Sequence, residues 1–133
     1  MTYEAICNAI RTRFEAQITV LESVTTFWDN APATPPDTAP WIRLAIRPGD
    51  AERTELSIKA YRIPGVAFAN IFTPIQLGDK SALEFADAIV AKFRSLSADG
   101  VTYRTPSVSV VGATQGKWWQ VNVQIPFEVR SVA

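Results

Sequence analysis

Histidine is absent from the 133 residues of this chain. Ser-His-Asp triads, histidine general bases and most zinc sites are therefore excluded, because each of them needs an imidazole. The 6 glycines stand far apart, at positions 49, 65, 78, 100, 112 and 116. A phosphate-binding loop needs its glycines close together, so neither a P-loop nor a dinucleotide fingerprint can be assembled. We expect a protein that is not an enzyme and binds no cofactor.

The chain has no formal net charge, since Lys plus Arg number 13 and Asp plus Glu number 13. Nucleic-acid binders draw much of their affinity from surplus cationic residues, so we expect no nucleic-acid sequence recognition. No run approaches the roughly 20 apolar residues of a membrane helix. Residues 1–16 carry no secretory pattern, which leads us to expect no membrane partner and a cytoplasmic setting in the cell that makes the protein.

Cysteine occurs once, at Cys7, so an internal disulfide is impossible. Cys7 falls in an apolar stripe and is best interpreted as a buried, inert thiol. An acidic group, Asp50, Glu52 and Glu55, is the nearest approach to a metal site or acid pair. Nothing apolar beside it would raise the pKa of a carboxylate, so a solvated hairpin tip is the better interpretation and no metal is expected.

The clearest pattern present is a strict alternation over residues 117–130, KWWQVNVQIPFEVR. Such alternation predicts a strand with one face on a core and one polar face. The predicted core face comprises Trp119, Val121, Val123, Ile125, Phe127 and Val129. Pro126 cannot donate a ladder hydrogen bond, so we expect an edge or a bulge there.

Two helices are predicted by apolar residues at spacings of three and four. The first covers residues 3–14, with Thr2 as its cap. The second follows Gly78, with Asp79 or Ser81 at its start. Its predicted apolar stripe comprises Leu83, Ala86, Ile89, Val90, Phe93 and Leu96.

Further strands are predicted on both sides of the second helix. A short one is expected at 25–28, before a proline-rich loop. Three more, at 41–47, 52–62 and 66–75, are joined by predicted turns at Pro48-Gly49-Asp50 and Pro64-Gly65. The first two would form a long exposed hairpin, and all three an antiparallel meander. Short strands at 101–104 and 107–111 flank Pro106, and a loop at 112–116 leads into the last strand.

These elements predict one α+β domain over residues 1–133. Its architecture would be an antiparallel or mixed β-sheet with two helices packed on one face and a long β-hairpin.

The charged hairpin is one candidate interaction surface, because its mixed charges suit a polar protein interface as well as they suit solvent. The residues expected to make contacts there are Arg47, Asp50, Arg53 and Lys59. Trp118 is a second candidate, since alternation directs it away from the core-facing Trp119. Either Trp118 is exposed at an interface, where tryptophan is enriched, or helices cover that other face of the sheet.

In this order, the elements resemble the phage tail terminator family, and the resemblance covers nearly the whole chain. The residues that carry it are Asn30 with its proline loop, Trp41-Ile42-Arg43, Pro48-Gly49, Gly65, Pro74, Gly78, the helix Ala86 to Phe93, Pro106, Gly112, Gly116 and the stretch Trp118 to Phe127. The resemblance implies an α+β domain that forms a hexameric ring, caps the tail tube, stops its polymerisation and offers the docking surface for the head.

The partners implied by this resemblance are further copies of the chain, the tail tube protein, and a neck, head-completion or connector protein. The implied location is the head-proximal end of the tail in the virion, after assembly in the host cytoplasm. A different head-tail joining protein of the virion is the main alternative. A small-ligand binder or an enzyme is the less favoured one.

Overall fold

The computed structural model describes residues 2–28, 34, 36, 38–53, 60–77, 80–114 and 116–132. Its helices are α1 (Tyr3–Phe14) and α2 (Lys80–Phe93), with a π-helical turn η1 (Glu15–Thr19) and a 3-10 turn η2 (Ile75–Leu77). Its strands are β1 (Thr25–Trp28), β2 (Trp41–Pro48), β3 (Glu52–Arg53), β4 (Ala60–Pro74), β5 (Ser97–Ala98), β6 (Val101–Tyr103), β7 (Ser107–Thr114) and β8 (Trp118–Val132).

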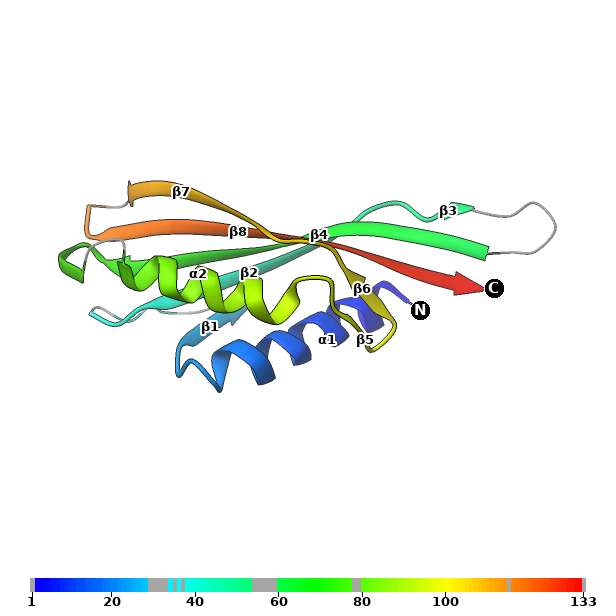
Figure 1. The fold of residues 1–133 in the computed structure, drawn as a ribbon, viewed down its shortest axis with the longest axis horizontal. Coiled ribbons are helices and arrows are strands. Elements are labelled where there is room, and N and C mark those ends of the chain that lie inside the picture. Colours follow the sequence, from blue (N-terminus) through cyan, green and yellow to red (C-terminus); the bar gives the residue numbers. More distant parts are fainter. Residues whose placement is uncertain are drawn as a thin grey trace.

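The described strands form one 8-stranded mixed sheet in the order β1-β2-β4-β8-β6-β5, with β3 beside β4 and β7 beside β8. β1 runs parallel to β2, and the other pairs are antiparallel. Both helices lie on the same face of the sheet, as Figure 1 shows. The predicted α+β class, with a mixed sheet and both helices on one face, is confirmed.

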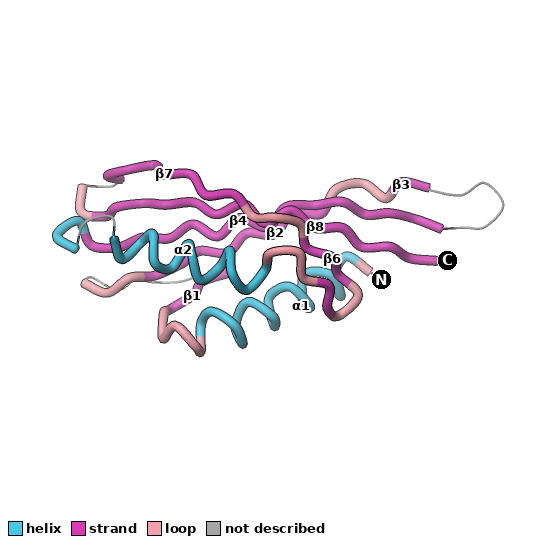
Figure 2. The backbone as a smooth tube through the Cα atoms, in the orientation of Figure 1, coloured by secondary structure: helices cyan, strands magenta, loops and turns pink. Residues whose placement is uncertain are grey.

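β4 and β8, each 15 residues long, pair along their whole lengths and form the spine of the molecule (Figure 2). The prediction of a turn at Pro64-Gly65 is wrong, because β4 runs straight through both residues. β2 pairs with the part of β4 from Gly65 to Phe72, and the hairpin is made by β3 with the beginning of β4. The expected meander of three strands is therefore not formed. Instead, β2 and β3 pair with successive parts of one long strand, β4.

Gly65 marks a close approach of neighbouring strands and not a turn. A Cβ atom at Gly65 would lie 2.5 Å from Cζ of Phe127 and 2.9 Å from the backbone oxygen of Arg47. Glycine in a strand interior often serves this purpose. The sequence pattern Pro-Gly is shared by turns and by such positions, which explains the wrong prediction.

Pro64 and Pro126 each lie at a position where the neighbouring strand of the sheet is interrupted. The Pro64 oxygen accepts from the Gly49 N–H, so the nitrogen side of Pro64 faces the gap between β2 and β3. The Pro126 oxygen accepts from the Arg104 N–H, in the gap between β6 and β7. The lack of an N–H in proline costs little at such a position, because no strand lies there to accept a hydrogen bond from it. Pro126 was expected at an edge or bulge, but it lies in an interior strand at this break between two short partners.

The helices bury the stripes that their spacing predicted. In α1 the buried residues are Ile6, Ile10 and Phe14, and the Thr2 hydroxyl accepts a hydrogen bond from the Ala5 N–H at 3.1 Å. In α2 the buried residues are Ala86, Ile89 and Phe93 of the predicted stripe, together with Ala82, which was not predicted. Leu83, Val90 and Leu96 of the predicted stripe are half-buried and pack against the core. Ser81 lies inside α2 and so does not cap it, while Asp79 lies outside the described residues.

The core fills the space between the helices and one face of the sheet. Phe93 joins the two layers, since its ring lies 6.0 Å from that of Phe14 and 5.1 Å from that of Tyr103. Burial raises the pKa of Tyr103 to about 12. Trp119 packs against this core, as the alternation predicted. None of the helices that the structure describes is long and apolar enough to cross a membrane.

Candidate interaction surfaces

The hairpin of β3 and the beginning of β4 extends past both helices at one end of the molecule (Figure 1). Three of its predicted contact residues, Arg47, Asp50 and Arg53, are exposed. Lys59, the fourth, lies outside the described residues, as does Glu55. The structure gives the end of β2 and the base of the hairpin a charged, accessible surface.

Arg47 and Arg53 do not share a face of the sheet. Residues directly opposite on antiparallel strands point to the same side, and Arg47 is opposite Val66 whereas Arg53 is opposite Tyr61. Val66 and Tyr61 have opposite parity along β4, so Arg47 points to the face without helices and Arg53 to the side of the helices. The two arginines therefore offer cationic groups in two directions, Arg47 from the end of β2 and Arg53 from the hairpin.

A charged network lies beside this hairpin on the face without helices. Its centre is Glu128 of β8, which is 7% exposed. Glu128 Oε2 accepts from Arg62 Nε at 2.5 Å and from Arg104 Nη2 at 3.1 Å. Arg130 Nε lies 3.5 Å from Glu128 Oε1, and Arg62 Nη1 donates to Glu52 at 3.1 Å. The network ties β3, β4, β8 and the segment after β6 together.

Hydrogen bonding fixes the ionisation of this network. The hydrogen bond from Arg62 lowers the pKa of Glu128, and burial acts in the opposite direction without prevailing. The same hydrogen bond raises the pKa of Arg62. Alternation assigned Glu128 to the polar face of its strand, but it gave no sign that Arg62 or Arg104 would meet it, because strand pairing brings them together.

Trp118 belongs to an aromatic cluster at the other end of the same face. It is 3% exposed and packs with Trp41 and Phe72, with Phe27 beside them. The rings of Trp41 and Phe72 stack with centroids 4.2 Å apart, and Trp118 meets Trp41 edge-on at 5.9 Å. The prediction of an exposed Trp118 is wrong, and so is the alternative of cover by a helix, since every residue of this cluster belongs to a strand.

Two cations border the aromatic cluster. The guanidinium carbon of Arg43 lies 5.7 Å from the centre of the Trp41 ring, and Lys117 Nζ lies 5.5 Å from that of Trp118. Both distances are typical of cation-π contacts. The cluster therefore presents cationic groups to its surroundings while its rings are covered by one another.

The thiol and the possible metal site were also considered in the sequence. Cys7 is half-buried and packs against the core. Among the described residues, no three His, Cys, Asp or Glu side chains are grouped as metal ligands. Within the hairpin, Arg62 pairs with Glu52.

Comparison with known proteins gives one family and one fold. A family model described as phage tail terminator protein matches residues 5–127. Among solved structures, 17 chains match. One of these aligns over 97% of this chain and 96% of its own, with a TM-score of 0.71 and 22% identity, which shows a shared fold. None of the curated proteins matches this chain.

Proposed function

Because this chain belongs to the phage tail terminator family, we propose that it caps a phage tail tube as a hexameric ring, stops tube polymerisation and provides the docking surface for the neck. The family is structural, so the chain has a structural role in a phage tail and is associated with the virion. The observation that carries the proposal is the family match, which extends over residues 5–127.

A ring explains how a small protein can hold the end of a polymer. Cyclic rings need a heterologous interface, in which one patch of a subunit meets a different patch of its neighbour. Each contact with the tube can then be weak, because several tethered contacts act together at high effective concentration. Once bound, the ring occupies the surface that the next tube subunit would use.

The charged hairpin is the part of the chain that we assign to tube or neighbour contact. It extends beyond the helices, and its exposed Arg53 points to the opposite face of the sheet from the exposed Arg47 at the end of β2. Such an arm can touch the tube with one face and the adjacent subunit with the other. Asp50 lies between them in the sequence and is exposed as well.

Deletion of the gene tests the proposed function directly. We expect overlong tubes by negative-stain electron microscopy, because nothing would cover the growing end. Tails of normal length that fail to join heads would contradict capping and would favour a head-side joining protein. Tails of normal length already joined to heads would remove this chain from both roles.

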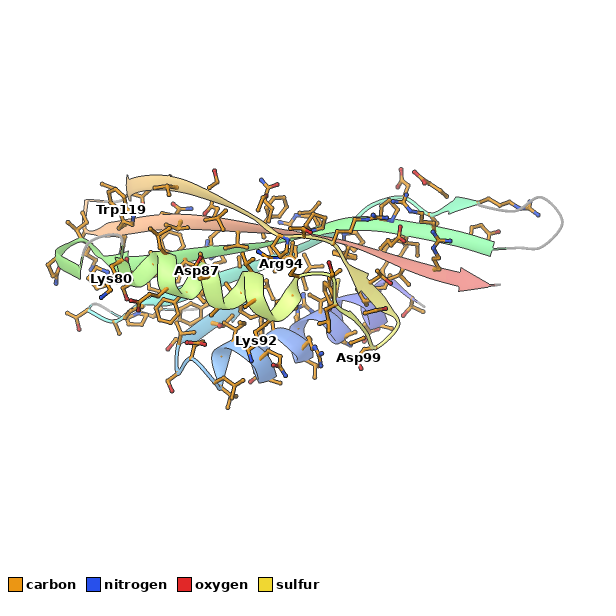
Figure 3. All side chains as sticks on the ribbon, viewed as in Figure 1. Lys80, Asp87, Lys92, Arg94, Asp99 and Trp119 are labelled. Atoms are coloured by element: carbon orange, nitrogen blue, oxygen red, sulfur yellow. The ribbon has the colours of Figure 1, made fainter. Side chains whose placement is uncertain are left out.

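Charge reversal tests the contribution of the hairpin. We expect the double variant Arg47→Glu, Arg53→Glu to fold and to leave tubes overlong when it replaces the wild-type chain. The matched control is Lys92→Glu, Arg94→Glu, which makes the same charge change on exposed residues at the end of α2 (Figure 3). Normal tube length with the hairpin variant would exclude these arginines from the mechanism.

A further inference from the structure

β7 is an edge strand with one of the features that usually protect such a strand, a β-bulge between Val110 and Gly112. It pairs with β8 on one side, and among the described residues no strand pairs with its other side. Its sequence, SVSVVGAT, contains neither a charged residue nor a proline. Val108 is 41% exposed and Val110 is 55% exposed. Soluble proteins normally block such edges with charges, prolines or covering segments, so this edge is suited to pairing with another strand.

The opposite edge of the sheet carries a second apolar patch. β1 pairs with β2, and no other strand is paired with it within the described part of the chain. The turn that leads into β1 exposes two aliphatic side chains, Val20 at 65% and Leu21 at 59%. β1 and β7 thus lie at opposite margins of one sheet (Figure 1). Exposed aliphatic residues lie on β7 and next to β1.

The two patches lie on the same side of the sheet. Val108 and Val110 are opposite Val123 and Val121, both of which face the helix layer. Val20 and Leu21 follow η1, so they belong to the helix layer too. When two subunits are placed side by side with the same orientation, the β7 valines of one therefore face the Val20-Leu21 turn of the other.

Strand directions are compatible with such a contact. β1 is parallel to β2, β2 is antiparallel to β4, β4 to β8, and β8 to β7. Hence β7 runs opposite to β1 within one subunit. Cyclic symmetry relates neighbouring subunits by a rotation about the ring axis and does not reverse them along it. When the strands run along that axis, β7 of one subunit and β1 of the next therefore meet as an antiparallel pair, the more stable kind of ladder.

We infer that β7 of one subunit pairs with β1 of a second copy of this chain, so that the sheet continues from subunit to subunit. This inference rests on the proposed ring and names the surfaces that form it. A contact between two β7 strands would be isologous and would end at a dimer, whereas the β7-β1 contact is heterologous and allows a ring to close. Val108 and Val110 would then be covered by Val20 and Leu21 of the neighbour.

Lysine variants of the two patches test the inference by complementation. We expect Val110→Lys and Leu21→Lys each to weaken self-association by about tenfold or more, because each would bury an unpaired charge in the contact. The measurement is light scattering during size-exclusion chromatography over a concentration series. Asn8→Lys is the matched control, because it adds the same charge at an exposed residue of α1, and it should assemble like wild type.

Mixing the two single variants gives the decisive result. Each keeps one intact patch, so a mixture can form a single wild-type contact, and we expect one-to-one dimers without rings. The double variant Val110→Lys, Leu21→Lys keeps neither patch and should stay monomeric alone. Circular dichroism should match wild type for all variants, since both positions are exposed.

Three outcomes would overturn the inference: a wild-type chain that is monomeric at every concentration, a Leu21→Lys variant that assembles normally, or a mixture that forms no dimer. These outcomes are separate from those of the gene deletion. Overlong tubes after deletion together with normal assembly of both lysine variants would leave capping in place and reject the β7-β1 contact alone.

Discussion

One face of the sheet is not covered by helices, and its two ends carry different kinds of side chain, aromatic at one end and charged at the other. One end holds the rings of Trp41, Phe72 and Trp118, and the other holds Glu128 with three arginines. Trp118 and Glu128 lie on the same strand and the same face, ten residues or about 33 Å apart. Along one face of β8, side chains are thus buried in two ways. Trp118 is buried by packing against other rings, and Glu128 is buried with its carboxylate hydrogen-bonded to arginines.

The two ends differ in what stabilises them. The aromatic end gains free energy from buried apolar area and ring geometry, which depend little on pH. It does so although the indole N–H of Trp41 has no partner within the described residues. The charged end depends on ionised partners, and its arginines Arg104 and Arg130 remain largely exposed. Solvent screening therefore limits how much this network contributes to stability.

The largest expected effect is at the aromatic end. Trp118→Ala should lower the free energy of unfolding by about 3–5 kcal/mol, the usual loss when a buried tryptophan is truncated. Urea denaturation followed by circular dichroism measures it, and Trp118→Phe, which keeps an aromatic ring, should lose less. A loss below about 1 kcal/mol for Trp118→Ala would mean that the rings do not stabilise this end.

A smaller effect is expected at Gly65, which lies beside the charged end and opposite Phe127. Gly65→Ala should cost about 1–3 kcal/mol, because the added methyl must displace the Phe127 ring or the Arg47 backbone. The same denaturation experiment measures this loss. Gly112→Ala is a useful comparison, since nothing lies within 4 Å of a Cβ there and only its φ of +99° opposes the change. Equal unfolding free energies for wild type and Gly65→Ala would show that the close approach is not tight.

The smallest effect, and the one that depends on pH, is expected at the charged end. Glu128→Gln should cost about 1 kcal/mol at pH 7, because it keeps the shape of the side chain and removes its charge. The folded pKa of Glu128 is lowered from the ordinary 4.5 by the Arg62 hydrogen bond. Its contribution is therefore complete above about pH 4.5 and is lost as the pH falls through the folded pKa.

Unfolding free energies of wild type and Glu128→Gln measured from pH 7 down to pH 3 test this dependence. The difference between them should shrink as the pH falls below the ordinary carboxyl pKa. A difference that is constant over this range would show that the charge of Glu128 contributes nothing. Trp118→Phe serves as the control at the other end, where the loss should not change over the same pH range.

Local patterns in the sequence predicted most of the elements. Spacings of three and four predicted the buried stripes of α1 and α2, and alternation predicted the core face of β8 from Trp119 to Val129. The family resemblance, which is confirmed over residues 5–127, added the structural role in a phage tail. The hairpin contacts of Arg47, Asp50, Arg53 and Lys59 stay a prediction.

Apart from Ser81, which lies inside α2 and does not cap it, the wrong predictions concern pairing between distant segments. Pro64-Gly65 has the local chemistry of a turn, yet it continues β4 because Gly65 fits under Phe127, 62 positions later in the chain. Trp118 alternates away from the core, and only the register of β2, β4 and β8 reveals that Trp41 and Phe72 cover it. Glu128 meets Arg62 for the same reason.

The sequence by itself determined most of the helices and strands and which side of each is apolar, because propensity, capping and periodicity act over a few neighbouring residues. The tertiary structure alone decided which strand pairs with which and in what register. Those choices place the aromatic cluster, the charged network and the open β7 edge, since they depend on packing between residues far apart in the chain.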